Sequence, residues 1–125
     1  YNDRGDIVQL LLDAGAEVNA ANFTGKTPLM SMIASHWDKQ TASLLVKAGA
    51  KLHIIDKHSG TALHNAARFC RPKVARDLLN LGASKGIRNQ LGQRPYDVIG
   101  EYIPGNGTNK NCSAHDRAVM ADILR

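Results

Sequence analysis

The histidines and cysteines are the residues of this chain with the most versatile chemistry, since imidazoles bind metals and move protons and thiolates act as nucleophiles. The five histidines are scattered along the 125 residues: His36, His53, His58, His64 and His115. A zinc site would need further Cys, His or carboxylate ligands at short, regular spacing, and no such cluster surrounds the middle three. We therefore expect no metal site, no cofactor and no catalytic centre.

Cys70 and Cys112 are the two cysteines, and 42 positions separate them without a CxxC pair. This spacing indicates neither a disulfide framework nor a set of zinc ligands. Arg68 and Arg71 lie close to Cys70 and would favour its thiolate, but an inert, partly buried thiol is the more common outcome. We therefore expect two free thiols in a reducing compartment.

The glycines form no phosphate-binding loop, because neither a GxxxxGK[ST] nor a GxGxxG pattern is present. They mark an internal repeat instead. The dipeptide Gly-Ala begins at positions 15, 49 and 82, at spacings of 34 and 33 residues, and each copy follows a run of aliphatic residues. Further side chains four positions upstream share one helical face with these aliphatics, so each unit ends in an amphipathic helix that stops at a glycine.

A turn and a second, shorter helix follow in each unit. The turn positions recur at the same spacings and are Asn22, Asp56 and Asn89. Glycine follows each of them, which predicts a projecting, hairpin-like loop at the start of each unit. Thr27 and Thr61 then offer hydroxyls that cap a helix. The residues expected to start the buried face of that helix are Leu29, Leu63 and Tyr96.

The segments that carry this pattern in register are LLDAGAEVNA at 11–20, GKTPLM at 25–30, SGTALHNAA at 59–67, LLNLGA at 78–83 and GQRPYDVI at 92–99. They resemble the ankyrin repeat family, whose period is about 33 residues. The resemblance implies an all-α ankyrin-repeat solenoid of helix-turn-helix units joined by projecting β-hairpin-like loops, and a structural hydrogen-bonding role for His64. It also implies a non-catalytic module that binds a peptide or domain of a partner protein on its concave face.

The repeat map makes residues 1–125 a single ankyrin repeat domain. Its units are a partial repeat at 1–21, repeats at 22–56 and 57–89, and a terminal repeat at 90–125 with an inserted loop at about 103–112. Ser113 or Asp116 is expected to start the last helix, because the insertion is rich in turn formers. The first unit is incomplete and one repeat cannot bury its face alone, so we expect further repeats before Tyr1 in a longer array.

Loop tips and exposed positions of the first helices form the concave face in proteins of this type. The candidate partner-binding residues are Phe23, Lys26, Trp37, Lys57, His58, Arg68, Phe69, Gln90 and Tyr102. Aromatic residues and arginine are enriched at binding hot spots, and Phe23 at a loop tip has little core to enter. The alternative role of Trp37 and Tyr102 is to cover the end of a helix pair, and that of Phe69 is to pack between neighbouring repeats.

Asn19 is a candidate modification site. The site that asparaginyl hydroxylases modify in ankyrin repeats resembles a pattern in this chain, which is Leu11 followed six residues later by Glu17, Val18 and Asn19. The alternative, which we favour, is that the Asn19 side chain bonds loop backbone and holds neighbouring hairpins in register.

The net charge of +5 is unevenly distributed. Residues 1–50 carry four basic and five acidic side chains, whereas the remainder carries 12 and six. The excess positive charge is concentrated in residues 68–94, where Asp77 is the one acidic residue. The basic residues of this segment are Arg68, Arg71, Lys73, Arg76, Lys85, Arg88 and Arg94. This patch predicts an acidic or phosphorylated partner segment near Arg68, beside Phe69 and Tyr102.

Three classes of function follow, led by the protein interaction module. The alternative is a regulatory or substrate-recruiting domain of a larger enzyme, such as a ubiquitin ligase adaptor or an acyltransferase. Binding of nucleic acid or anionic lipid is prompted by the charge alone, and the low aromatic content and absent motifs argue against it. No apolar window approaches 18 residues, so we expect no transmembrane segment and an intracellular location, with the cytoplasm favoured over the nucleus.

Overall fold

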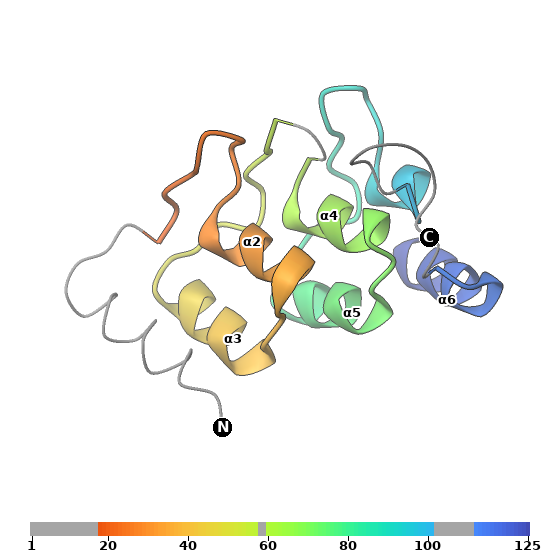
Figure 1. The fold of residues 1–125 in the computed structure, drawn as a ribbon, viewed down its shortest axis with the longest axis horizontal. Helices are drawn as coiled ribbons and strands as arrows, with labels where there is room; N and C mark the ends of the chain where they lie inside the picture. Colours follow the sequence, from red (N-terminus) through yellow and green to blue (C-terminus); the bar gives the residue numbers. More distant parts are fainter. Residues whose placement is uncertain (1–17, 58–59, 102–111) are drawn as a thin grey trace.

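The computed structural model describes residues 18–57, 60–101 and 112–125. Its helical elements are α2 (Pro28–Ser35), α3 (Lys39–Lys47), α4 (Ala62–Arg68), α5 (Pro72–Asn80), the 3₁₀ turn η1 (Pro95–Val98) and α6 (Ala114–Leu124). Figure 1 shows α2–α3 and α4–α5 as two helix pairs side by side, with loops projecting from one edge of the stack. No strand occurs in the described ranges, so the predicted all-α repeat architecture is confirmed.

The helices begin where hydroxyl side chains satisfy their free amides. The Thr27 hydroxyl accepts from the Met30 amide at the start of α2, and Pro28 takes the first helical position. Thr61 accepts from the His64 amide at the start of α4 in the same way. The predicted caps are confirmed, and each satisfies one of the four backbone donors that a helix leaves unpaired.

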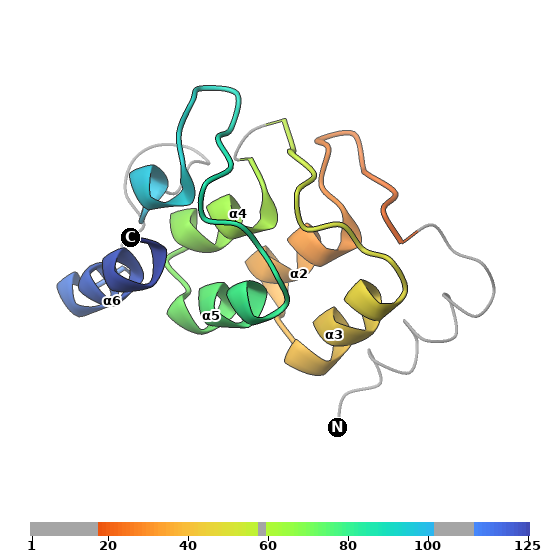
Figure 2. The same cartoon turned by 180° about the vertical axis from the view of Figure 1, so that it is seen from behind.

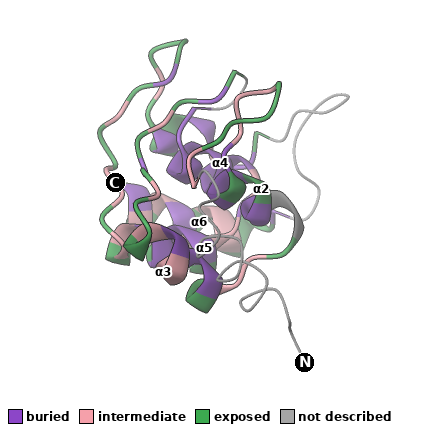
Figure 3. Cartoon of the chain, turned by 90° about the vertical axis from the view of Figure 1, so that its left-hand side faces the viewer, coloured by how far each residue is buried: buried purple, intermediate pink, exposed green. Residues whose placement is uncertain are grey.

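The core lies between the layers of helices, with α4 at its centre. Every residue of α4 is buried, and the helix contacts α2, α5 and η1. Leu29 and Leu63 are buried, as predicted for the first turns of α2 and α4. Figure 3 shows burial concentrated in the helices, whereas the projecting loops are mostly exposed. None of the helices in the described part of the chain is long and apolar enough to cross a membrane.

The fourth repeat departs from the other two in its first helix. Among the described residues between α5 and α6, only the 3₁₀ turn η1 is helical, and Tyr96 is 38% exposed, so the prediction that Tyr96 starts a buried face was wrong. Val98 is buried there instead, and α4 is the element that η1 contacts most. Arg94 stands where Thr27 and Thr61 cap the earlier helices, and its backbone amide donates to Asp97 rather than extending a regular helix.

The last helix forms as the sequence predicted. Ser113 caps α6, since its hydroxyl accepts from the Asp116 amide at 3.0 Å. Met120 and Leu124 are buried, and α6 packs against α5. Of the predicted insertion at 103–112, the structure describes only Cys112, and most of the partial repeat at 1–21 likewise lies outside the described residues.

The expectation of two free thiols was wrong, because Cys70 and Cys112 form a disulfide. Their Cα atoms lie 5.5 Å apart, within the range that a disulfide requires. Cys70 ends the turn after α4, and Cys112 lies just before α6. The fold therefore brings together two residues whose separation of 42 positions carries no pairing signal by itself.

Candidate protein-binding surface

The projecting loops hold their shape through one repeated hydrogen bond. At each predicted turn position, a side-chain oxygen accepts a hydrogen bond from the backbone amide two or four residues later in the chain, and this bond closes the loop. The Asn22 side chain accepts from the Thr24 amide at 2.9 Å, and the Asp56 side chain accepts from the Gly60 amide at 2.8 Å. The Asn89 side chain accepts from the Gln93 amide at 3.0 Å. The predicted turns are confirmed, and their polar interiors are satisfied without a ligand.

Large apolar side chains stand at the tips of two of these loops. Phe23 is 87% exposed, and Leu91 on the third described loop is 78% exposed. Sequence reasoning placed Phe23 at a tip but missed Leu91. A signal was present, because Leu91 stands between Asn89 and Gly92 much as Phe23 stands between Asn22 and a glycine.

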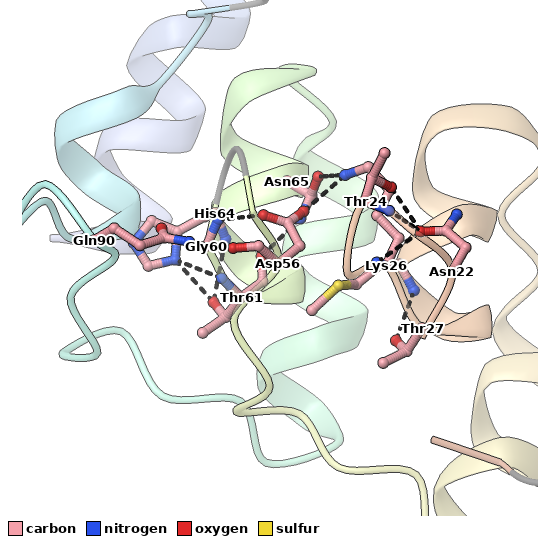
Figure 4. Close-up of polar contacts among 11 residues, drawn as sticks. Asn22, Thr24, Lys26, Thr27, Asp56, Gly60, Thr61, His64, Asn65 and Gln90 are labelled. Atoms are coloured by element: carbon pink, nitrogen blue, oxygen red, sulfur yellow. Dashed lines mark hydrogen bonds and ion pairs between the residues drawn. The ribbon is translucent and has the colours of Figure 1, made fainter. Parts of the chain in front are cut away.

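Lys26, predicted to bind a partner, takes part in an internal network. Its ammonium donates to Asp56 Oδ2 at 2.8 Å and to Asn65 Oδ1 at 2.7 Å (Figure 4). Asn65 Nδ2 in turn donates to Asp56 Oδ2 at 3.2 Å. Asp56 and Asn65 are buried, so this network ties the first loop to the second loop and to α4. The charge of Lys26 is therefore compensated inside the protein.

His64 links its own helix to the next loop. Its Nδ1 accepts from the Thr61 amide at 3.1 Å (Figure 4). Its Nε2 lies 2.7 Å from the Gln93 carbonyl oxygen. Only the neutral ring protonated on Nε2 satisfies both neighbours. Burial lowers the pKa of His64 and so favours this neutral form. The structural hydrogen-bonding role that the family resemblance implied is confirmed.

Gln90 and Lys57 lie on the exposed side of the loops. The Gln90 amide donates to the backbone carbonyl of Asp56 and so links the third loop to the second. The Lys57 backbone amide donates to the Thr24 carbonyl at 3.0 Å, whereas its side chain is exposed. Cross-loop bonds of this kind tie the described parts of neighbouring loops together.

Arg68 is buried, contrary to the exposure that we predicted for it. Its side chain is 5% exposed, and Nη1 lies 3.1 Å from the Glu101 carbonyl oxygen and 3.8 Å from Glu101 Oε2. Arg68 Nε has no hydrogen-bond partner among the described residues. The reason is the central position of α4, which η1 and the following turn cover. Phe69 is half-buried and packs against the core, which matches its alternative role.

Trp37 lies in the turn between α2 and α3 and is half-buried against the core. Its Nε1 donates to Asp77 Oδ2 at 2.9 Å. The indole therefore bridges two repeats, as in the alternative role of covering the end of a helix pair. His58 and Tyr102, the other predicted contacts, lie outside the described residues.

The Asn19 side chain forms hydrogen bonds with the backbone of the next repeat unit. Its Nδ2 donates to the Gly49 carbonyl at 3.0 Å, and its Oδ1 accepts from the Lys51 amide at 2.8 Å. Both partners lie in the connection that follows α3, so the side chain can hold this connection in register. Hydroxylation of Asn19 stays a prediction that mass spectrometry of protein from its native cell would test.

No group of three His, Cys, Asp or Glu side chains with metal-binding geometry occurs among the described residues. The described surface instead offers ordered loops with exposed apolar tips. Exposed apolar side chains on such loops are suited to recognition of another macromolecule.

Comparison with known proteins identifies the family. The model of ankyrin repeats in three copies matches residues 1–89. Human protein phosphatase 1 regulatory subunit 27 is 40% identical over 60 residues, which cover 48% of this chain and 39% of that protein. The E3 ubiquitin-protein ligase XBAT32 of Arabidopsis thaliana is 38% identical over 76 residues, or 60% of this chain and 15% of that protein.

Human palmitoyltransferase ZDHHC13 is 32% identical over 82 residues, which cover 65% of this chain and 13% of that protein. The chain thus spans well under half the length of each of these curated relatives. Because the family model covers more than half of the chain, this chain belongs to the ankyrin repeat family.

Proposed function

We propose that this chain is a non-catalytic interaction module whose loop tips and concave face bind a peptide or domain of a partner protein. The observation that carries the proposal is the exposure of Phe23 and Leu91 at two loop tips, at 87% and 78%. Their loops are closed by internal hydrogen bonds, so neither side chain is needed to shape its loop. Large apolar side chains on ordered, exposed loops are typical of protein-binding surfaces.

The charges near the tips favour an acidic partner segment. Lys57 is exposed on the second loop, and Arg88 is exposed beside the third, where Nη1 donates to the Gly92 carbonyl at 2.7 Å. The second loop lies between the first and third (Figure 1). A partner carboxylate next to an apolar side chain would therefore find Lys57 between Phe23 and Leu91. Lys26 and Arg68 are not part of this surface, because Lys26 pairs with the buried Asp56, and Arg68 is itself buried beside Glu101.

The test is affinity capture from the native cell with the wild-type chain and the double variant Phe23→Ala, Leu91→Ala. We expect the variant to lose a protein that the wild type retains. The matched control is Tyr96→Ala, which removes an exposed aromatic ring outside the loop tips and should retain that protein. Equal recovery with wild type and double variant would overturn the assignment of the tips.

A second candidate is a regulatory or substrate-recruiting domain of a larger enzyme. The chain resembles parts of a palmitoyltransferase and of an E3 ubiquitin-protein ligase, and it spans 13% and 15% of those proteins. The sequence that flanks the chain in its gene decides between the two candidates. Binding of nucleic acid or anionic lipid rests on net charge alone, and a flat binding isotherm at low salt would exclude it.

We propose an intracellular, cytoplasmic location for the module, as expected of a partner-binding domain of this family. The Cys70–Cys112 disulfide argues in the opposite direction, because disulfides persist mainly in oxidising compartments. Alkylation of thiols in intact cells, followed by mass spectrometry of both cysteines, separates these alternatives. Alkylated cysteines support the cytoplasm, and a recovered disulfide supports a secretory location.

A further inference from the structure

A cavity lies at the far ends of the helices from the projecting loops. It occupies about 390 Å³ between the turn that joins α2 to α3 and the start of α5. Its lining residues are His36, Trp37, Arg71, Pro72, Lys73 and Val74. The volume falls in the range of about 300–1,000 Å³ that is usual for ligand pockets. The loop tips with Phe23 and Leu91 contribute nothing to it.

One wall of this cavity is apolar and held in place. The hydrogen bond from Trp37 Nε1 to Asp77 ties down the polar edge of the indole, and the ring packs partly against the core. Pro72 and Val74 complete this wall from the first turn of α5. An apolar side chain could therefore bind against a preformed surface, at little cost in ordering the protein.

The other lining groups are basic. The Arg71 and Lys73 side chains form no ion pair or hydrogen bond with any residue that the structure describes. The acidic groups nearby have other roles, because Asp77 accepts from Trp37, and Asp38 caps α3 and accepts from the Thr41 hydroxyl at 2.5 Å. The cavity thus joins an indole with two basic side chains that have no ion-pair partner in the part of the chain that the structure describes.

The start of α5 adds to this positive potential. Arg71 occupies the N-cap position, and no side chain caps the first turn of α5. The partial positive charge of a helix start favours a nearby anion, although only within the first turn. The basic side chains supply the larger part of the attraction, because each carries a full charge.

We propose that this cavity is a second binding site, which takes an acidic peptide segment with an apolar residue next to a carboxylate. The carboxylate would pair with Arg71 and Lys73, since guanidinium and ammonium groups form strong, charge-assisted hydrogen bonds with it. The neighbouring apolar side chain would lie on Trp37 and Pro72. This site lies on the opposite edge of the stack from the loop tips and does not depend on what they bind.

Trp37 reports on the cavity directly, because it is the single tryptophan of the chain. The experiment titrates the 125-residue chain with a short peptide of two glutamates beside a leucine and follows indole fluorescence. We expect a saturable change, and no such change with the matched peptide in which glutamine replaces both glutamates. Because this comparison uses the wild-type protein, it does not depend on how any variant folds.

The variant Arg71→Gln, Lys73→Gln should bind the acidic peptide about tenfold more weakly or worse, as expected from the loss of hydrogen bonds between charged groups. The matched control Lys47→Gln, Lys51→Gln removes the same net charge at two exposed lysines outside the cavity and should bind like the wild type. Phe23→Ala should also leave this titration unchanged, so failure at the tips and failure at the cavity are distinguishable.

Three results would overturn the proposal. They are an equal response to the glutamine peptide, equal weakening in both double variants, and a stronger response to anionic vesicles or an RNA oligonucleotide than to the acidic peptide.

Discussion

His64 shows how one buried side chain can set the behaviour of this protein with pH. Its Nδ1 and Nε2 are held between the Thr61 amide and the Gln93 carbonyl, so the folded chain favours the neutral ring. Burial holds the pKa of His64 below its ordinary value of 6.5, and the positive charge of Arg68 acts in the same direction. Protonation of the ring would cost the bond to Thr61 and place a charge in the core.

We predict that this protein loses stability as the pH falls below about 6.5. In that range the unfolded chain binds a proton at His64 while the folded chain does not, so the free energy of unfolding decreases with pH. The contribution of His64 is fully present above pH 6.5 and is lost as the pH approaches the lower pKa of the folded state. Thermal unfolding across this range, followed by circular dichroism, measures the effect.

The variant His64→Asn separates this effect from the other histidines. Asparagine offers an acceptor to the Thr61 amide and does not titrate, so part of the pH dependence should disappear. Loss of the bond to the Gln93 carbonyl should also lower stability by about 1–3 kcal/mol. The matched control is His115→Gln, which changes an exposed histidine and keeps the contacts of His64 with Thr61 and Gln93, so the pH dependence that comes from His64 should persist in it. Identical profiles for His64→Asn and the wild type would refute the assignment.

Single residues differed in how far the sequence could place them. The exposure of Phe23 followed from local turn signals, because its neighbours Asn22 and Gly25 fix the loop. The internal contacts of Lys26 and Arg68 depend on partners far away in the sequence, since Asp56 lies 30 positions from Lys26 and Glu101 lies 33 positions from Arg68. Their positions in the repeat, at a loop tip and on a first helix, marked both residues as candidate contacts for a partner, and only the stacked repeats reveal their contacts within the chain.

At the scale of elements, agreement with prediction depends on how strong the local signals are. The starts of α2, α4 and α6 were predicted because a Thr or Ser hydroxyl caps each one. The first helix of the terminal repeat shrank to η1, where Arg94 replaces the capping Thr and Gly100 follows within two residues of the turn. The apolar pattern in this segment is short, and a short pattern does not distinguish a full α-helix from a single 3₁₀ turn.

The loops make a sharp prediction about glycine. Gly60 and Gly92 both have positive φ, 124° and 76°, but their surroundings differ. A Cβ on Gly60 would lie 2.7 Å from the His64 ring and 2.9 Å from Asn89 Cβ, whereas nothing lies within 4 Å of a Cβ on Gly92. We expect Gly92→Ala to cost about 1–2 kcal/mol, the usual penalty for a left-handed residue.

Gly60→Ala adds a steric clash to that penalty and should cost about 3 kcal/mol or more. Urea denaturation of the two variants against the wild type measures the difference directly. Equal losses would mean that backbone conformation alone determines the effect and that the contact between the second loop and His64 is looser than the structure indicates.

At the scale of the whole molecule, the terminal repeat is attached by packing and by a covalent bond. The turn η1 contacts α4, and the Gly100 amide donates to the Ala67 carbonyl at 2.8 Å. The helix α6 packs against α5, and the disulfide joins the end of the α4 turn to the start of α6. The solenoid was predictable because each repeat contacts only its neighbours, so the period suffices. The disulfide was not, because it depends on the path of an insertion that breaks the period.

The last prediction concerns this bond. Closing a loop between residues 42 positions apart restricts the unfolded chain, and chain entropy then predicts about 4 kcal/mol of stabilisation. We expect a reductant to lower the free energy of unfolding by about that amount, with α6 losing amide protection before α3. The matched variant is Cys112→Ser, because Cys70 has a φ of 57° and substitution there would also alter a left-handed backbone. Reductant should have no further effect on Cys112→Ser, since it has no bond left to reduce. If the untreated wild type instead has two alkylatable thiols and the stability of Cys112→Ser, then packing of α6 on α5 holds the terminal repeat unaided.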